Sequence, residues 1–517
     1  MNLRLRHIVR ISLFTLLLTA CQFEDDRQCP ENNVGDSYIN LTISVSNGGT
    51  HSKTRAGEKP SSGEDGDGRE AGFERENAVT GITLILYQDA NGINTTSDPI
   101  LDFVRYFPVT KVESATQGTS YDAGSAHTNH STQIEAKYTT GPQMVGKYGV
   151  SKIDFSKTYH AIVIANYDMT GSLTEGTSKL SNVRDATLST IYSGDNTKAA
   201  NVFTNFVMSS EEDNTLNFAV LGIMTEDATG DKHYDLSGQP LIIERMAARI
   251  DFWAKGGTYD ATTYTTPGYV YRPWKTTDTS EPTSADRFVV TRITPFNLNA
   301  GTEYLLKRTN DAAKYLASET GSNYVIDPAT STKTGTETPS TFVNALSGIA
   351  SLSDLSENGY CHTIAAMHAQ VGTGLTGGFN YNDGSTTAED VIICYPMENT
   401  LPDESPLYYY ATGIAIEGDY YIGNNTTDAT KREHRVYFGY IRHQGESAEA
   451  YDALLPSELS TMVTTLDTKP MNFGIVRNNI YRISIEKVLE KVEEAPRLKI
   501  KIEETKWRHV DNPAIYI

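Results

Sequence analysis

Short runs in which apolar residues recur at every second position, separated by turn residues, occur along most of this chain and limit its fold class. In YINLTISV every second side chain is aliphatic, so Ile39, Leu41, Ile43 and Val45 would share one face of a strand. GITLILY, YHAIVIANYD, DVIICYP and YYYATGIAIEG have a similar character. Clusters of Gly, Asn, Asp and Ser between the runs, together with 30 tyrosines, favour strands over long helices. The sequence therefore predicts an all-β protein.

The length of 517 residues is too great for one ordinary domain and suits two large ones. Turn residues gather in ATGDKHYDLSGQP, which places the expected boundary near Gly230 to Pro240. Thr- and Ser-rich inserts such as TSTKTGTETPST, between residues 258 and 370, are interpreted as surface loops of the second domain.

The N-terminus has the pattern of an export signal. Arg4, Arg6 and Arg10 precede the apolar run ISLFTLLLTA, which is too short to span a bilayer and ends in small residues. The next residue completes LTAC, which resembles a bacterial lipobox in which Cys21 carries the lipid; an ordinary signal peptide with a chance cysteine is the alternative. No later run reaches the roughly 18 apolar residues of a membrane-spanning helix, so membrane contact would depend on this lipid.

A long polar loop runs from Asn47 to Glu76 between two predicted strands. Loops of this length are usually functional or disordered, and exposed polar loop tips are preferred sites of proteolysis. The loop contains SKTRAGE, in which Arg55 precedes Ala56, and two further arginines, Arg69 and Arg75. We expect cleavage after Arg55, with the other two arginines as rival sites.

The charge and the cysteine content argue against some classes of protein. With 44 basic and 65 acidic residues the formal net charge is −21, which argues against binding to nucleic acid or to an anionic membrane surface. Four cysteines are too few for a disulfide scaffold, and the sequence leaves open whether Cys361 and Cys394 pair.

Catalytic and metal-binding motifs are weak. The chain has no HExxH, GxSxG, GxxxxGK[ST] or CxxC pattern. His127 and His130 have no third ligand nearby, and a solvated loop is the better interpretation of both. His362 and His368 suit a surface or half-buried element. We therefore expect no enzymatic activity, no cofactor and no metal site.

The C-terminal segment is apolar to its last residue. The charged stretch KVLEKVEEAP is expected to interrupt the sheet pattern, after which Leu498, Ile500 and Ile502 alternate with charged residues. The chain then ends in HVDNPAIYI, with its apolar side chains at Val510, Ile515 and Ile517. Either this segment completes the sheet of its own molecule, or it is offered to another molecule.

Several motifs, taken in order, resemble the type V pilins (fimbrillins) of Bacteroidales-like Gram-negative bacteria. VRNNIYRISI resembles a signature found late in these proteins, and PLIIERMAARIDF resembles the stretch that opens their second domain. AIVIAN and NFVMSS are similar to strands of their first domain, and TRAG is similar to their site of cleavage by an arginine-specific protease. LKIKIEETKW, with Trp507 at the family's tryptophan, resembles their C-terminal appendage.

The resemblance implies two transthyretin-like β-sandwich domains in tandem, with long loops and a C-terminal donor strand. The implied segments are a signal peptide (1–20), a lipidated propeptide carrying the groove-filling strand (21–55), an N-terminal domain (56–235), a C-terminal domain (236–490) and an appendage (491–517). Cleavage between Arg55 and Ala56 would release the propeptide strand, and the appendage of another subunit would take its place.

The implied function is a structural fimbrial subunit, which its motifs assign to the stalk. The resemblance implies that it is held at the outer membrane as a palmitate-bearing lipoprotein precursor and then built into the cell-surface fimbrium. Its implied partners are further copies, related pilins and an arginine-specific protease. A tip or anchor subunit is an alternative. A monomeric glycan-binding surface lipoprotein is another, for which Trp274 in YRPWK is the one loop aromatic platform among three tryptophans.

Overall fold

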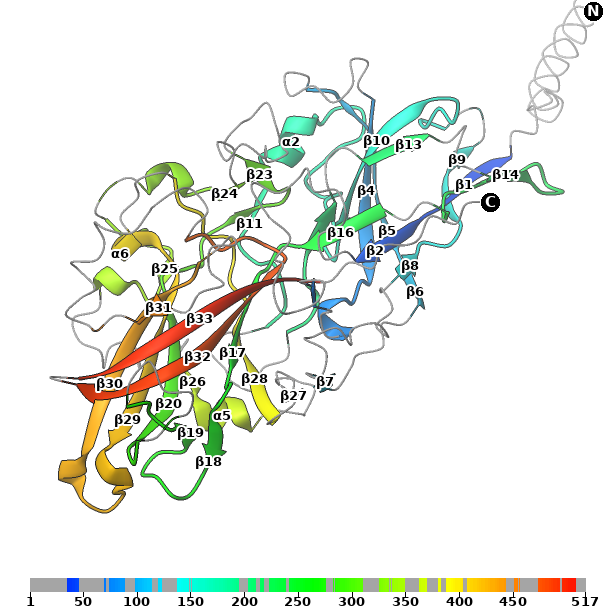
Figure 1. Cartoon of the computed structure of the whole chain (residues 1–517). Coiled ribbons are helices and arrows are strands. Elements are labelled where there is room, and N and C mark those ends of the chain that lie inside the picture. The colour runs from blue at the N-terminus through cyan, green and yellow to red at the C-terminus, as the bar shows by residue number, and fades with distance from the viewer. Residues whose placement is uncertain are drawn as a thin grey trace, which may run out of the picture.

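The computed structural model contains many short strands and few helices (Figure 1). It describes residues 35–45, 69–70, 74–88, 98–113, 120–122, 137–147, 149, 151–194, 203–210, 214–217, 223–238, 241–275, 282, 284–309, 325–333, 335, 337–348, 362–369, 380–382, 387–402, 407–442, 451–453, 455, 473–492 and 495–507.

Two sheets are built mainly from the first half of the chain. The smaller has the order β14 (Ile223–Glu226), β15 (Lys232–Asp235), β1 (Asp36–Asn40), β9 (Gln143–Lys147). The larger has the order β5 (Leu101–Pro108), β4 (Gly81–Tyr87), β10 (Thr158–Ala165), β12 (Met208–Ser210), β16 (Leu241–Arg245), β2 (Thr42–Val45), β8 (Lys137–Thr139), β6 (Thr110–Glu113), with β13 (Asn214–Asn217) also paired to β10.

Two further sheets contain most of the second half. One has the order β3 (Arg69–Glu70), β33 (Ala495–Trp507), β32 (Asn479–Val492), β17 (Arg249–Trp253), β28 (Thr387–Cys394), β27 (Asn380–Asn382), β7 (Ser120–Asp122), with β31 (Tyr451–Asp452) also on β33. The other has the order β18 (Thr258–Asp260), β19 (Gly268–Tyr271), β20 (Arg287–Phe296), β29 (Gly413–Tyr421), β30 (Arg432–Tyr440), with β26 (His362–Thr363) also on β20.

The remaining elements are short. Three strand pairs are β11 (Thr187–Leu188) with β22 (Glu303–Tyr304), β21 (Leu298–Asn299) with β25 (Phe342–Val343), and β23 (Arg308–Thr309) with β24 (Val325–Ile326). The helices are α2 (Leu180–Arg184), α5 (Ile364–His368), α6 (Leu407–Tyr410), and the 3₁₀ turns η1 (Glu74–Glu76), η4 (Thr330–Thr332), η5 (Leu346–Gly348), η6 (Ile422–Asn424) and η7 (Ala429–Lys431). In the part of the chain that the structure describes, no helix is long and apolar enough to cross a membrane.

Buried apolar side chains form two main clusters. The first comes mostly from residues 39–247, and the second comes from residues 248–500. β4 and β10 pair in antiparallel register along their buried centres, where Ile162 lies opposite Ile85 and Val163 opposite Leu84. Figure 1 shows the strands of the first cluster at the upper right and those of the second at the lower left.

The all-β prediction is confirmed, and strands are present where GITLILY, YHAIVIANYD and DVIICYP predicted them, as β4, β10 and β28. The tandem transthyretin-like sandwiches and the domain boundaries given above stay predictions. β16, which begins one residue after Pro240, pairs with β12 and β2 in the larger sheet of the first half.

One strand prediction is wrong. The charged stretch KVLEKV does not interrupt the sheet, because β32 continues through it to Val492, which pairs with Ala495 of β33. Two of its charged side chains have partners beside the strand: Glu490 accepts from Ser284, and the Lys487 ammonium lies 4.5 Å from the centre of the Trp274 ring. Charged residues can be accommodated in an antiparallel hairpin because one face of such a sheet does not have to pack against an apolar core.

Truncation of Leu84 in β4 should destabilise the protein. The side chain is fully buried, so Leu84→Ala should leave a cavity and lower the free energy of unfolding by about 3 kcal/mol. Val112 in β6 is 53% exposed, and Val112→Ala serves as the control with a change below about 0.5 kcal/mol. Urea unfolding curves would measure both, and equal losses in the two variants would contradict this view of the core.

Candidate assembly site

The first described segment of the chain forms two consecutive strands, β1 and β2. The single strand expected from Tyr38 to Val45 begins earlier, at Asp36, and breaks at Leu41, where the chain passes from the smaller sheet to the larger one. The four aliphatic side chains predicted to share a face are all buried, with exposed fractions of 1%, 1%, 0% and 3% for Ile39, Leu41, Ile43 and Val45.

Both strands lie in the interior of their sheets. β1 is parallel to β15 on one side and antiparallel to β9 on the other, with Ile39 opposite Tyr234 and Gln143. β2 is parallel to β16 and antiparallel to β8, with Ile43 opposite Leu241 and Tyr138. The segment thus pairs with both neighbours in each of two sheets.

Hydrogen bonds also hold the junction between the two strands. The Leu41 amide donates to Thr140 Oγ1 at 3.0 Å, and the Leu41 carbonyl accepts from the Thr140 amide at 3.0 Å. The Asn40 carbonyl accepts from the Leu236 amide at 2.8 Å. Because the backbone stays satisfied at the crossing, the segment can pass between sheets without leaving a buried polar group unpaired.

Removing this segment would change both sheets at once. β15, β9, β16 and β8 would each lose a row of backbone partners, and exposed edges of this kind readily pair with another chain. Four aliphatic side chains contribute roughly 1.5–3 kcal/mol each on burial, or on the order of 10 kcal/mol together. A strand of similar apolar pattern would regain much of this, so the site left behind is chemically suited to accept a replacement strand.

The described part of the C-terminal segment belongs to a sheet of its own chain. β33 runs antiparallel to β32, with Leu498 opposite Val488, Ile500 opposite Ile485 and Ile502 opposite Ile483. The backbone of Trp507 also pairs with Glu70 of β3. The sequence left two alternatives open for this segment. Up to Trp507 the strand completes a sheet of its own molecule. Donation of the segment to a second copy stays a prediction.

Other predicted site residues lie outside the described part of the chain: Cys21, Arg55, Ala56, Val510, Ile515 and Ile517. His127, His130 and Cys361 also lie outside it. Cys394 is a buried free cysteine. The described residues contain no group of three potential metal-ligating side chains.

Sequence reasoning missed a set of fully buried arginines near the border of the two apolar clusters. Arg249 of β17 donates to Asp251 Oδ2 at 2.7 Å and to Glu76 Oε2 at 3.2 Å. Arg245 of β16 donates to the Glu76 carbonyl at 2.9 Å, and the Tyr395 hydroxyl donates to the Glu76 carboxylate. Burial opposes the charge of Arg249, but Asp251 and Glu76 raise its pKa well above the ordinary value.

The VRNN motif supplies another buried arginine. Arg477 donates to Glu398 Oε2 at 2.8 Å and lies 3.0 Å from Glu303 Oε1. The next residue, Asn478, accepts from Arg245 Nη1 at 3.1 Å. The two motifs PLIIERMAARIDF and VRNNIYRISI therefore meet in space through polar side chains, although their apolar residues were the signal used to place strands.

These contacts fix the chain immediately after the long polar loop. Glu76 is fully buried, Asn77 accepts a hydrogen bond from Arg245, and the Asn77 carbonyl accepts from the Tyr138 hydroxyl at 2.7 Å. The segment before the loop is held by β-sheet pairing, whereas the segment after it is held by buried charge.

No protein-family model and no curated protein matches the chain. Among solved structures, the chain matches a fimbrilin of Porphyromonas gingivalis W83 at 13% identity and a TM-score of 0.33, covering 93% of this chain and 99% of that chain. It matches a C-terminally truncated tip fimbrial protein of Porphyromonas gingivalis at 10% identity and a TM-score of 0.35, covering 91% of this chain and 100% of that chain. It also matches a proposed cell adhesion protein of Parabacteroides distasonis at 12% identity and a TM-score of 0.39, covering 92% of this chain and 100% of that chain. At these identities and TM-scores, the similarity identifies neither the family nor the function of this chain.

Replacing Ile43 by Asn should weaken the insertion of β2. The Asn amide would be buried without a hydrogen-bond partner, and the apolar contacts of Ile43 would be lost. Together these changes should lower the free energy of unfolding by about 3 kcal/mol or more. Asp36→Asn at the half-buried start of β1 is the control and should change it by less than about 1 kcal/mol. Urea unfolding would measure both, and a neutral Ile43→Asn variant would show that β2 contributes little to the fold.

Replacing Arg249 by Met should destabilise the protein more strongly than loss of a surface ion pair. Glu76 and Asp251 would then lose their buried ion pairs with Arg249, and loss of one partner of a buried pair typically costs about 3–5 kcal/mol. Arg308→Met, which breaks an ion pair with the exposed Asp185, is the matched control and should cost at most about 1 kcal/mol. Thermal unfolding of the two variants would compare them, and similar midpoints would exclude a central role for the cluster.

Proposed function

We propose that this chain is a structural subunit of a cell-surface fimbrium, most simply of the stalk, which assembles by exchanging its β1–β2 segment for a strand from another subunit. In this proposal the chain is exported as a lipoprotein precursor with lipid on Cys21, and cleavage after Arg55 starts assembly. Its role is structural and not enzymatic.

The observation that carries the proposal is the position of β1 and β2. They are interior strands of two sheets, yet they come first in the described chain and are joined to the next described strand, β3, only through the polar loop. One cut in this loop would convert an intramolecular strand into a separate peptide held by noncovalent contacts alone. Such a peptide can dissociate and be replaced by β-augmentation.

The buried charges after the loop support this division. Glu76 is held by Arg245, Arg249 and Tyr395, so the chain from this point onward would keep its place after cleavage. A cut would then separate the lipid and the β1–β2 segment from an intact remainder.

The two rival arginines lie in ordered elements. Arg69 lies in β3, and its backbone pairs with Lys506 of β33. Arg75 lies inside the 3₁₀ turn η1 beside buried Glu76. Proteolysis favours exposed segments without such backbone pairing, so Arg69 and Arg75 are less suited to be the cleaved residue.

We propose that the incoming strand comes from the C-terminal region of another subunit. Within β33 the residues up to Trp507 are already paired in their own sheet, so the apolar residues beyond it, Val510, Ile515 and Ile517, are the proposed donors. A subunit that gives one strand and accepts one makes a head-to-tail contact, which does not close and extends into a filament.

A glycan-binding lipoprotein has less support. Trp253 is buried, and Trp274 is bonded along its backbone to β32 through Val488 and Glu490. The Lys487 ammonium lies over the Trp274 ring, so this ring is not an open aromatic platform.

Arg55→Ala should yield a folded precursor that does not polymerise, because the β1–β2 segment remains covalently attached. The measurements are the N-terminal residue of protein taken from the surface of its native cell and the detergent-resistant ladder on a gel. Wild-type protein should begin at Ala56 and form ladders, whereas the variant should begin at Cys21 and migrate as a monomer.

Arg69→Ala is the matched control, since it removes a basic residue from the same loop and should leave both processing and ladders unchanged. Normal ladders from Arg55→Ala would overturn the cleavage step. A wild-type chain that begins at Cys21 and remains monomeric would favour an anchor subunit or a monomeric lipoprotein instead.

A further inference from the structure

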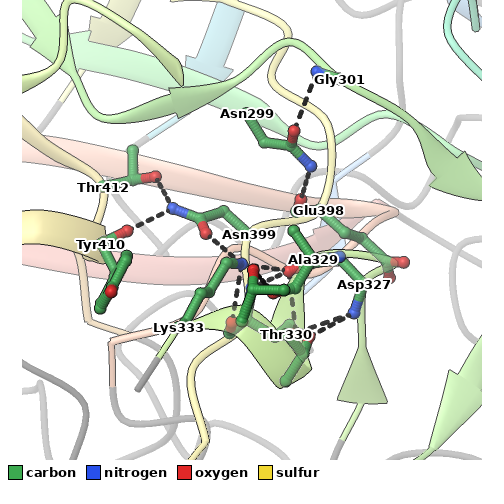
Figure 2. Close-up of polar contacts among 12 residues, drawn as sticks. Asn299, Gly301, Asp327, Ala329, Thr330, Lys333, Glu398, Asn399, Tyr410 and Thr412 are labelled. Carbon is green, nitrogen blue, oxygen red and sulfur yellow. Dashed lines mark hydrogen bonds and ion pairs between the residues drawn. The ribbon is translucent and has the colours of Figure 1, made fainter. Parts of the chain in front are cut away.

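A fully buried lysine lies between a carboxylate and a side-chain amide in the second half of the chain. Lys333 Nζ is 2.5 Å from Asp327 Oδ2 and 2.7 Å from Asn399 Oδ1, and it donates to the Thr400 carbonyl at 2.9 Å. Figure 2 shows these groups converging on the lysine nitrogen. The exposed fractions of Lys333, Asp327 and Asn399 are 0%, 2% and 0%.

The three residues come from two separate segments. Asp327 and Lys333 flank the 3₁₀ turn η4, and Asn399 follows β28, 66 residues after the lysine. The Asn399 backbone is fixed by an isolated bridge to Ile475. The fold therefore holds an amine and an amide carbonyl in contact although they are distant in sequence.

The Asn399 amide has a fixed orientation. Its Nδ2 donates to the Tyr410 carbonyl at 2.7 Å and to Thr412 Oγ1 at 2.7 Å (Figure 2). It also donates more weakly to the Asn297 carbonyl at 3.2 Å. The amide oxygen is thereby directed at Lys333. Polar contacts that orient a reacting group in a water-poor site are the usual basis of proximity catalysis.

The surroundings also favour a nucleophilic amine. A lysine must lose its proton before it can attack, and burial lowers the pKa of Lys333, although the Asp327 carboxylate opposes this shift. Asp327 is positioned to take that proton, and its own carboxylate is held by the backbone amides of Ala329 and Thr400, each at 2.8 Å. A buried carboxylate beside the amine is the requirement for proton transfer during amide exchange.

We propose that Lys333 and Asn399 join in the folded chain through an intramolecular amide bond, with Asp327 carrying the proton. The Nζ lone pair adds to Asn399 Cγ, a bond forms between Nζ and Cγ, and the bond between Cγ and Nδ2 breaks. Nζ starts as an ammonium with three protons and ends as an amide nitrogen with one, so Asp327 takes two protons from it in turn: the first passes to Nδ2, which leaves as ammonia, and the second passes to this ammonia, which is released as ammonium. The exchange needs no oxidant, reductant or cofactor.

Such a bond would form within one subunit and does not depend on cleavage or strand exchange. It would tie the η4 turn covalently to the chain after β28, beside Glu398 and the Arg477 contact. In a filament under tension, a covalent tie holds where an ion pair would separate.

The test is peptide mapping of the folded full chain by tandem mass spectrometry after chymotrypsin digestion. We expect a branched peptide that joins the Lys333 and Asn399 segments, with a mass below the sum of the two by one ammonia. Unlinked peptides as the main species would overturn the proposal. A single unbranched peptide that contains both Asp327 and Lys333 and is lighter by one water, from a loop between these two side chains, would overturn the assignment to Asn399.

Three variants separate chemistry from folding. Lys333→Met should abolish the branched peptide, and Lys307→Met, which removes another lysine bonded to a carboxylate, should retain it. Asp327→Asn keeps the shape of the site but should slow accumulation of the branch by roughly a hundredfold. An unchanged rate in Asp327→Asn would exclude the proposed proton carrier. The wild-type map decides the main question even if a variant does not fold.

Discussion

The rest of the structure depends on the two-sided backbone pairing of residues 36–45. β1 and β2 occupy interior positions, so the hydrogen bonds of β15, β9, β16 and β8 are completed only while this segment is present. An edge strand can leave a sheet with little consequence for its neighbours, but an interior strand cannot, because its loss creates two new edges and uncovers the apolar layer beneath. This constraint means that the segment completes the backbone pairing of both sheets, which is the feature on which the proposed strand exchange rests.

Buried charge complements this pairing. Four arginines, at positions 245, 249, 477 and 482, are fully buried, and Glu76, Asp251, Glu303 and Glu398 lie among them. Arg477 reaches Glu303 at the start of β22 and Glu398 after β28, and Arg249 reaches Glu76 at the end of η1. Buried pairs of this kind add little net stability relative to an apolar core, but breaking one side is expensive. Burial lowers the pKa of Arg245 to about 10, which still leaves it charged at neutral pH.

The local residue pattern was sufficient to predict strands and their buried side chains where one face of a strand packs against an apolar core. The alternation in YINLTISV correctly placed four side chains in the interior, and the runs at Ile82 and Ile162 became paired strands. The same reasoning failed at KVLEKV, where charged side chains beside a long hairpin find partners on neighbouring segments. It also could not locate the break at Leu41, since the change of sheet depends on Thr140, a residue 99 positions away.

The sequence by itself determined the β-rich class and the burial of the first strand, because residue type and period act over a few neighbours. Only the tertiary structure decided that β1 and β2 are interior strands of two sheets, that the C-terminal strand up to Trp507 pairs within its own chain, and that Lys333 meets Asn399. Each of these depends on contacts between segments far apart in the chain. No local period encodes which distant segment will supply the partner.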